Sequence, residues 1–327
     1  MDLSPFDSLF SKNVPHILEK IFLSLDYESY KKCLQVSKDW KEQLTSELFQ
    51  RKGKSVFNEE LFLDEGKLIK ASRDGIQDEV KRLLSSVMLD VNCKYGPRSC
   101  KDGPRGPGST SLRWPGSTPL HQAAFYGRSL VVQILLNMGA DLSKADIFGL
   151  TPLHWAAGGL RVTHKKVVRV LLDAGADPNK TNSCGRTPLH MVKNKDMAKL
   201  LLDGGADPNI TKKDGQTPLH YAAQFCSKDV IGLLLERGVD LNVEDRYGNT
   251  PLNKAAQFGN TNVIKLLLER GANPNKANRF GKTPLHYGAA SGHNEMVKLL
   301  LDKGADRNKV DNSGQTPRDL SSKNRLV

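Results

Sequence analysis

The stretch Thr118-Pro119-Leu120-His121 decides the fold, because it returns six times along the chain. Further copies begin at Thr151, Thr187, Thr217, Thr250, Thr283 and Thr316, with Asn253 in place of the histidine in the fifth copy and a decayed Thr-Pro-Arg-Asp in the last. Successive copies are 33, 36, 30, 33, 33 and 33 residues apart. A motif that recurs at about this interval indicates a stack of similar units.

The residues around each copy predict two helices and a loop. Threonine caps a helix by accepting a backbone N–H, and proline at the first helical position gives up only an N–H that has no partner there. The small residues that follow, such as Ala123-Ala124, favour close stacking of this first helix. An apolar stretch such as 131–136 then places its side chains three and four residues apart, which is typical of a second, amphipathic helix. A Gly-Ala-Asp-like sequence ends it and predicts a hairpin-like loop.

This period and signature resemble those of ankyrin repeats. The resemblance implies an all-α solenoid of helix-turn-helix repeats with hairpin loops, with six repeats and a truncated C-terminal capping repeat in residues 118–327. Residues 66–117 are interpreted as a degenerate first repeat that lacks Thr-Pro. This repeat carries an insertion rich in Gly, Pro and Arg at about 94–116, from which we expect a mobile basic loop.

Two repeats differ in length from the others. Residues 158–164 add three residues between the helices of the second repeat, and the third repeat loses three around 191–195. Two interpretations stay open: tolerated length variation in a surface connection, or a local distortion that shapes the binding groove for one partner.

Residues 1–60 do not fit the repeat and predict two or three short amphipathic helices. Their motifs are Val14-Pro15, Ile21-Phe22, Leu25-Asp26 and Val36-Ser37-Lys38-Asp39-Trp40, whose joint spacing resembles an F-box. Pro15 stands one residue late, and Ser37 replaces the common cysteine. The resemblance implies docking on the Skp adaptor of Skp-cullin-F-box ubiquitin ligases through Pro15, Ile17, Leu18, Ile21, Phe22 and Leu25.

The combined motifs predict a non-catalytic substrate adaptor. The ankyrin repeats would bind a target protein, the F-box would recruit the Skp adaptor and cullin, and ubiquitin transfer would take place on other subunits. The chain would act as a monomer within a hetero-complex. The alternative is an ankyrin scaffold or inhibitor whose N-terminal helices only cap the solenoid. A basic nucleic-acid binder is the weakest of the three hypotheses.

Specificity in ankyrin proteins usually lies in the loop tips and on the inner-helix surface, so we expect the partner contacts there. The candidates are exposed aromatic, apolar and charged residues: Phe125, Tyr126, Ile147, Phe148, Lys213, Asp214, Phe225, Arg246, Tyr247, Phe258, Arg279 and Phe280. Aromatic residues and arginine provide large contact areas and strong hydrogen bonds in protein interfaces.

Composition excludes several classes of function. The net charge is +12, but residues 1–65 hold 9 basic against 12 acidic residues and the remainder holds 39 against 24, with no continuous basic block. The 5 scattered cysteines do not suggest a disulfide framework. Without an apolar run of membrane-spanning length or a secretory signal, we expect the cytoplasm or nucleus. The repeating histidines are interpreted as hydrogen-bonding framework residues, and we find no motif for a cofactor, a metal or catalysis.

Overall fold

The computed structural model describes residues 54–85, 89–94, 116–159, 161–225 and 227–321. The chain divides into two compact units, Met1–Leu61 and Phe62–Val327. Of the first unit, only the helical residues 54–61 are described. The F-box-like motifs, with Pro15, Ile17, Leu18, Ile21, Phe22 and Leu25, therefore lie outside the described residues, as does nearly all of the inserted basic loop.

The described residues form helices and turns and contain no strand. The all-α solenoid that the sequence predicts is confirmed. The first helix of each repeat is short: α6 (Pro119–Phe125), α8 (Pro152–Ala157), the 3₁₀ helix η2 (Pro188–Met191), α11 (Pro218–Gln224), α13 (Pro251–Gln257), α15 (Pro284–Ser291) and α17 (Pro317–Ser321). The second helices are α7 (Ser129–Asn137), α9 (Val162–Asp173), α10 (Lys195–Asp203), α12 (Lys228–Glu236), α14 (Thr261–Glu269) and α16 (Asn294–Asp302).

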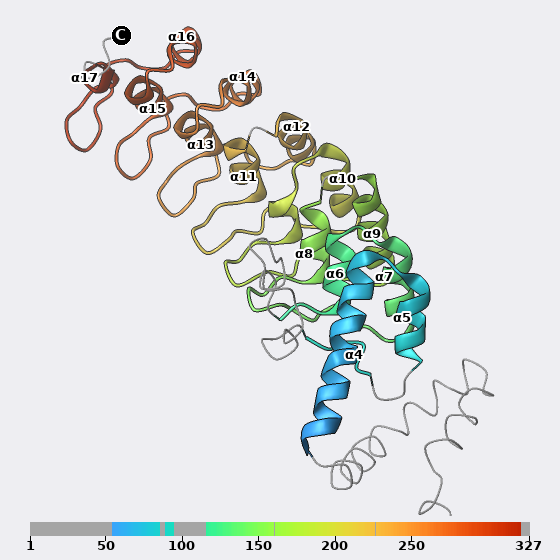
Figure 1. Cartoon of the computed structure of the whole chain (residues 1–327). Coiled ribbons are helices and arrows are strands. Elements are labelled where there is room, and N and C mark those ends of the chain that lie inside the picture. Colours follow the sequence, from blue (N-terminus) through green and yellow to red (C-terminus); the bar gives the residue numbers. More distant parts are fainter. Residues whose placement is uncertain (1–53, 86–88, 95–115, 160, 226, 322–327) are drawn as a thin grey trace, which may run out of the picture. The chain divides into compact units, whose positions relative to one another are not determined.

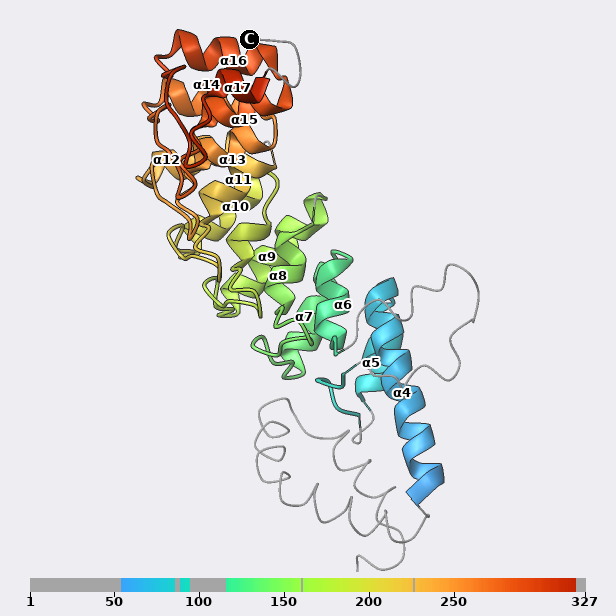
Figure 2. The ribbon, with the colours of Figure 1, turned by 90° about the vertical axis from the view of Figure 1, so that its left-hand side faces the viewer.

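The helices of the second unit stack as two parallel rows. In Figure 1 each helix pair lies beside the next, and a long loop projects from each pair on the same side. The perpendicular view in Figure 2 shows the helix pairs in the same order along the stack. The core lies between and along the rows, where Leu120, Leu153, Leu219 and Leu252 are almost completely buried. Burying one such side chain contributes about 2 kcal/mol to stability.

Each Thr-Pro-Leu-His motif begins a helix and also joins two repeats. The backbone N–H of Thr118 donates to Nδ1 of His121 at 3.1 Å, and Nε2 of the same imidazole lies 2.9 Å from the carbonyl oxygen of Leu150 in the next repeat. His154, His190, His220 and His286 make the equivalent inter-repeat contacts at 2.9–3.2 Å. The framework role predicted for these histidines is confirmed.

Asn253 performs the same task with an amide. Its Oδ1 accepts the N–H of Thr250 at 3.1 Å, and its Nδ2 donates to the carbonyl of Lys282 at 3.2 Å. The motif therefore requires an acceptor and a donor at two fixed places, which both side chains supply.

The two irregular repeats accommodate their length changes in different helices. In the second repeat, which has the three added residues, helix α9 is 12 residues long. In the third repeat the first helix shortens to η2, a 4-residue 3₁₀ helix, after which Asn194 caps α10 by accepting the N–H of Met197 at 2.9 Å. Whether either change shapes the groove for one partner stays a hypothesis.

The stack begins with a helix pair that lacks the Thr-Pro motif. These helices are α4 (Lys54–Asp74) and α5 (Gln77–Leu84). Helix α4 buries Leu68 and Ile69, and helix α5 buries Val80 and Leu83. The guanidinium Nε of Arg128 donates to the carbonyl of Arg73 at 3.1 Å and so links this pair to the first complete repeat. Across the described ranges, no helix is both long and apolar enough to cross a lipid bilayer.

Candidate functional site

Six loops project from the stack, and we call them fingers 1 to 6. They comprise residues 141–150, 177–186, 207–216, 240–249, 273–282 and 306–315. A buried carboxylate or amide organises most of them. In finger 1, Oδ1 of Asp146 accepts the N–H groups of Phe148 and Leu150 at 2.8 and 2.9 Å. Asn182, Asp245, Asn278 and Asp311 hold fingers 2, 4, 5 and 6 in the same way.

Finger 3 departs from this pattern because Lys212 stands where the others have Asp or Asn. A lysine cannot accept a backbone N–H. Asp214, two residues later, accepts the N–H of Gln216 at 3.2 Å and pairs with the Lys212 ammonium at 3.0 Å. The sequence-predicted tip residue Asp214 is thus partly committed to holding its own finger.

The finger tips are joined to one another by backbone hydrogen bonds. Ser183 N–H donates to Phe148 O at 2.9 Å, and Lys213 N–H to Cys184 O at 3.0 Å. Three equivalent bonds continue the series: Arg246 to Asp214, Arg279 to Tyr247 and Asn312 to Phe280, at 2.9, 2.9 and 3.0 Å. We call this series the tip ladder. These main-chain bonds hold the tips of six fingers in register, and Asn312 Nδ2 adds one side-chain bond to Arg279 O at 2.9 Å.

A second contact fixes several fingers to the helix that follows them. The indole N–H of Trp155 donates to Oδ2 of Asp146 at 3.1 Å. Lys254 pairs with Asp245 at 3.2 Å, and Tyr287 accepts from Asn278 Nδ2 at 2.8 Å. Each helix residue stands directly after the signature His or Asn and nine residues after its finger partner. These residues therefore fasten three of the fingers to the helices that follow them.

Finger 6 lacks this fastening. Oδ2 of Asp311 is buried and has no hydrogen-bond partner among the described residues. Leu320 occupies the position that corresponds to Trp155 and Lys254, and its side chain has no donor. In the same terminal repeat, Asp319 replaces the signature histidine and accepts the Thr316 N–H at 2.8 Å.

The fingers present most of the predicted contact residues to solvent. The exposed fractions of Ile147, Phe148, Tyr247 and Phe280 are 59%, 55%, 50% and 55%. Lys213, Arg246 and Arg279 are exposed as well, whereas Asp214 is half-buried. Large apolar side chains on a rigid frame are the usual anchors of protein interfaces. The tip ladder brings these residues into one row, and their part in binding stays a prediction.

The predicted helix-end residues form a second group with mixed environments. Phe225 and Phe258 follow α11 and α13 directly and are about half exposed. Phe125 is less exposed, since its ring lies edge to face against Tyr126 and Trp155 with centroids 5.1 and 5.6 Å apart. Phe225 and Phe258 thus offer more free surface than the Phe125–Tyr126 pair.

Burial keeps the signature histidines neutral. It lowers the pKa of His121 and of His190 to about 4, and it also lowers the pKa values of His154, His220 and His286. In each imidazole Nδ1 accepts a threonine N–H and Nε2 donates to a carbonyl, so neither nitrogen is available to a metal or a substrate. No group of three or more potential metal ligands occurs within the part of the chain that the structure describes.

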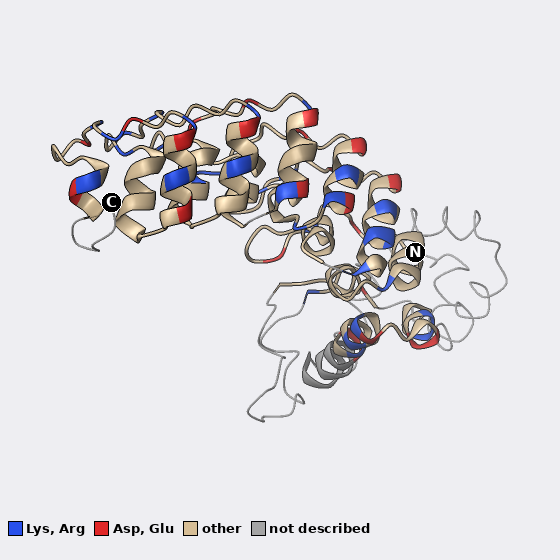
Figure 3. Cartoon of the chain, turned by 90° about the horizontal axis from the view of Figure 1, so that it is seen from above, with Lys and Arg blue, Asp and Glu red and all other residues tan. Residues whose placement is uncertain are grey.

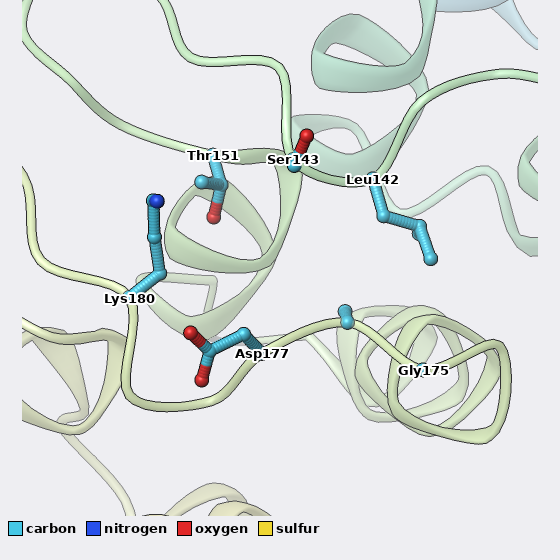
Figure 4. Close-up of a pocket in the computed structure, with 7 residues that line it drawn as sticks. Leu142, Ser143, Thr151, Gly175, Asp177 and Lys180 are labelled. Atoms are coloured by element: carbon cyan, nitrogen blue, oxygen red, sulfur yellow. The ribbon is translucent and has the colours of Figure 1, made fainter.

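A small hollow lies between the bases of fingers 1 and 2, with a volume of about 180 Å³. Figure 4 shows Leu142, Ser143 and Thr151 from one repeat facing Gly175, Asp177 and Lys180 from the next. This volume is below the roughly 300 Å³ of ordinary small-molecule sites. The extended finger surface therefore remains the candidate site.

Charge on the second helices is arranged in mixed bands. Figure 3 shows basic residues near the middle of several of these helices and acidic residues at their ends. One such acid, Asp203, pairs with Arg237 of the next repeat at 2.6 Å. A single-sign face of the kind that favours nucleic acid does not form on these helices.

A family model for ankyrin repeats matches residues 68–182, 160–245, 190–278 and 242–311. The chain belongs to the ankyrin-repeat family. Its ankyrin stack is similar to two solved structures. The human ASB11 ankyrin repeat domain has 29% identity and a TM-score of 0.58, and the match covers 63% of this chain and 92% of that one. The ankyrin repeat domain of Bcl-3, described as a unique member of the IkappaB protein family, has 31% identity and a TM-score of 0.55, with 64% and 99% covered.

Two curated proteins share shorter stretches with the ankyrin chain. Palmitoyltransferase AKR1 of Saccharomyces cerevisiae is 38% identical over 73 residues, or 22% of the chain, and human oxysterol-binding protein-related protein 1 is 34% identical over 84 residues, or 24%. The matched part spans 7% of the length of each relative. Ankyrin repeats are protein-binding modules, so the repeats indicate that the chain binds a protein.

Proposed function

We propose that the chain is a non-catalytic adaptor whose fingers and helix ends bind a target protein. The tip ladder carries this proposal, because it fixes exposed apolar and cationic side chains in one row without using those side chains for structure. A preorganised row of this kind lowers the entropy cost of association. In this role the chain itself would catalyse no reaction.

The second half of the proposal is recruitment of a ubiquitin ligase through the N-terminal segment. Its support is the resemblance of Ile21-Phe22, Leu25 and Val36 to Trp40 to an F-box. The segment would bind the Skp adaptor and cullin and bring the target close to the transferring subunits, where proximity promotes reaction. The complex would work in the cytoplasm or nucleus, with one copy of the chain in each assembly.

A pull-down with three variants of the full chain tests both halves. The native chain should recover the Skp adaptor, cullin and a target. Ile21→Asp with Phe22→Ala should lose the Skp adaptor and cullin and keep the target. Tyr247→Ala with Phe280→Ala should do the reverse, while Ser183→Ala with Cys184→Ala, the matched change on the exposed tip of finger 2, should keep all partners.

Two results would overturn the halves separately. If the native chain recovers no Skp adaptor, the ligase half is wrong and the alternative of a plain ankyrin scaffold or inhibitor replaces it. If the Tyr247 and Phe280 variant, shown by circular dichroism to be folded, keeps every partner, the finger surface is not the target site.

A further inference from the structure

Three cations stand at the same position of three successive fingers. Lys213, Arg246 and Arg279 are each the first tip residue of fingers 3, 4 and 5, and each donates its backbone N–H to the tip of the preceding finger. We call these residues the cation row. Their side chains are exposed, and no ion pair joins them to a carboxylate among the described residues.

The nearby carboxylates do not cancel this charge, because each already has another partner. Asp214 pairs with Lys212 at 3.0 Å, Glu244 with Lys276 at 2.7 Å and Asp245 with Lys254 at 3.2 Å. The cation row therefore presents positive charge that a ligand can satisfy. Charge-assisted hydrogen bonds to carboxylates are the strongest contacts such groups make.

Glycines in the preceding fingers set the position of the two arginines. Cγ of Arg246 lies 3.1 Å from the place that a Cβ on Gly215 would occupy, and Cγ of Arg279 lies 3.1 Å from the same place at Gly248. The arginine stems thus lie against neighbouring backbone that carries no side chain. Packing of this kind reduces the freedom that an arginine would lose on binding.

The spacing expected for the row matches one extended ligand conformation. Packed helices lie about 8–10 Å apart, so successive fingers of the stack repeat at roughly that distance. In a polyproline II segment every third residue lies on the same face, and three residues span about 9 Å. In a β-strand, by contrast, residues three apart point to opposite faces.

We propose that the cation row binds an acidic segment of the target in polyproline II conformation, with Asp or Glu at every third position. The aromatic rings of Tyr247 and Phe280, the second tip residues of fingers 4 and 5, contact the residues between the acids. This inference rests on the proposed target-binding function of the fingers and specifies its ligand.

A protein segment fits the row better than single-stranded nucleic acid. Proteins that bind single strands track the backbone over about 4–16 nucleotides with a continuous positively charged groove. Here the row has only three members, and the adjoining tips of fingers 2 and 6 hold Ser183, Cys184, Asn312 and Ser313, none of which is basic.

Fluorescence anisotropy with labelled peptides tests the proposal on the full chain. The probe is a repeating Glu-Pro-Ala peptide of about ten residues, which places an acid at every third position. Its controls are the Gln-Pro-Ala peptide and a peptide of the same composition with all acids at one end. The probe should bind at least about tenfold more tightly than either control, and the difference should shrink as salt is added.

Charge neutralisation identifies the residues responsible. Arg246→Gln with Arg279→Gln should weaken binding of the probe at least about tenfold. The matched pair Arg270→Gln with Lys303→Gln removes the same charge from exposed helix ends and should leave binding unchanged within about twofold. Equal binding of the clustered-acid or Gln peptide, no binding of the probe, or tighter binding of oligothymidylate would each overturn the proposal.

A cross-linking arm separates this proposal from the proposed function. Phe280→p-benzoylphenylalanine in the full chain should join it to a protein in cells, whereas the same replacement at Arg270 should not. If the Glu-Pro-Ala probe does not bind while the cross-link forms, the proposed ligand with an acid at every third position is wrong and the adaptor function stands. If both fail, both proposals fall.

Discussion

Lys254 and Asp245 form an ion pair at 3.2 Å in which the carboxylate side chain is completely buried and the lysine side chain is 10% exposed. The pair ties finger 4 to helix α13. Burial alone would raise the pKa of Asp245, but the N–H groups of Asn249 and the Lys254 ammonium outweigh it and leave the pKa below its ordinary value.

Removal of the lysine should therefore cost far more than removal of an exposed one. We expect Lys254→Met to lower the free energy of unfolding by about 2–4 kcal/mol, because it leaves a buried carboxylate without its counter-charge. Lys276→Met, which breaks the exposed pair with Glu244, should cost less than about 1 kcal/mol. Urea unfolding measures the free energy of unfolding of both variants. Equal losses would show that the buried Lys254–Asp245 pair contributes no more than the exposed Lys276–Glu244 pair.

Acid should weaken the stack through its histidines. Their pKa values are lowered in the folded chain, so the unfolded chain binds more protons as the pH falls below 6.5, and stability is lost until the folded pKa is reached. For His121 and His190, whose folded pKa is about 4, the loss is up to about 3 kcal/mol each. Urea midpoints should decline steadily between pH 7 and 4.

Asparagine offers the matched control for this pH dependence, because Asn253 already makes both framework hydrogen bonds. We expect His121→Asn to keep a stable stack at pH 7 and to lose less stability on acidification than the native chain. The same acid-induced loss in both proteins would mean that His121 does not contribute to it.

The tip ladder should depend on glycine in the finger turns. Gly248 has φ +73°, and a Cβ there would lie 2.9 Å from the backbone nitrogen of Arg279. Gly248→Ala should cost more than the roughly 1–2 kcal/mol of a left-handed alanine. Gly238→Ala, at φ +77° with nothing within 4 Å, should cost only that amount. Thermal unfolding of the two variants compares the close approach with backbone strain alone.

The unpartnered oxygen of Asp311 predicts a stabilising substitution. Leu320→Lys supplies the donor that Lys254 supplies to Asp245, so we expect a gain of about 1 kcal/mol over Leu320→Met, which keeps an apolar side chain. Chemical denaturation of the two variants is the measurement. Equal midpoints would indicate that solvent already satisfies Asp311.

Much of the fold could be predicted because its signals are local and repeated. Thr-Pro predicts each helix start, and the histidine after Leu120 or Leu153 predicts an inter-repeat bond wherever it recurs. The three-residue loss near Met191 was visible as well. Its absorption by the first helix, which becomes η2, was not, because the spacing of motifs does not say which of two adjoining segments will shorten.

The fastening of the fingers was the part that sequence reasoning missed. Trp155, Lys254 and Tyr287 look unrelated as side chains, although each stands nine residues after the Asp or Asn that it meets. That constant offset was the available signal. The tip ladder left none, since backbone hydrogen bonds between loops leave no trace in residue identity.

The tip ladder has a consequence for how such a protein acquires a new binding partner. Main-chain bonds join the tips, and the side chains that also link neighbouring fingers stand mostly at other positions, such as Asn242, Asn275 and Asn278. Most tip side chains therefore do not support the stack, and exchanging them need not disturb their neighbours. New specificity can thus arise one tip at a time. Lys212 and Asp214 are the exception, because on finger 3 the Asp214 carboxylate both supports the loop and belongs to its tip. The sequence of finger 3 is therefore the least free to change.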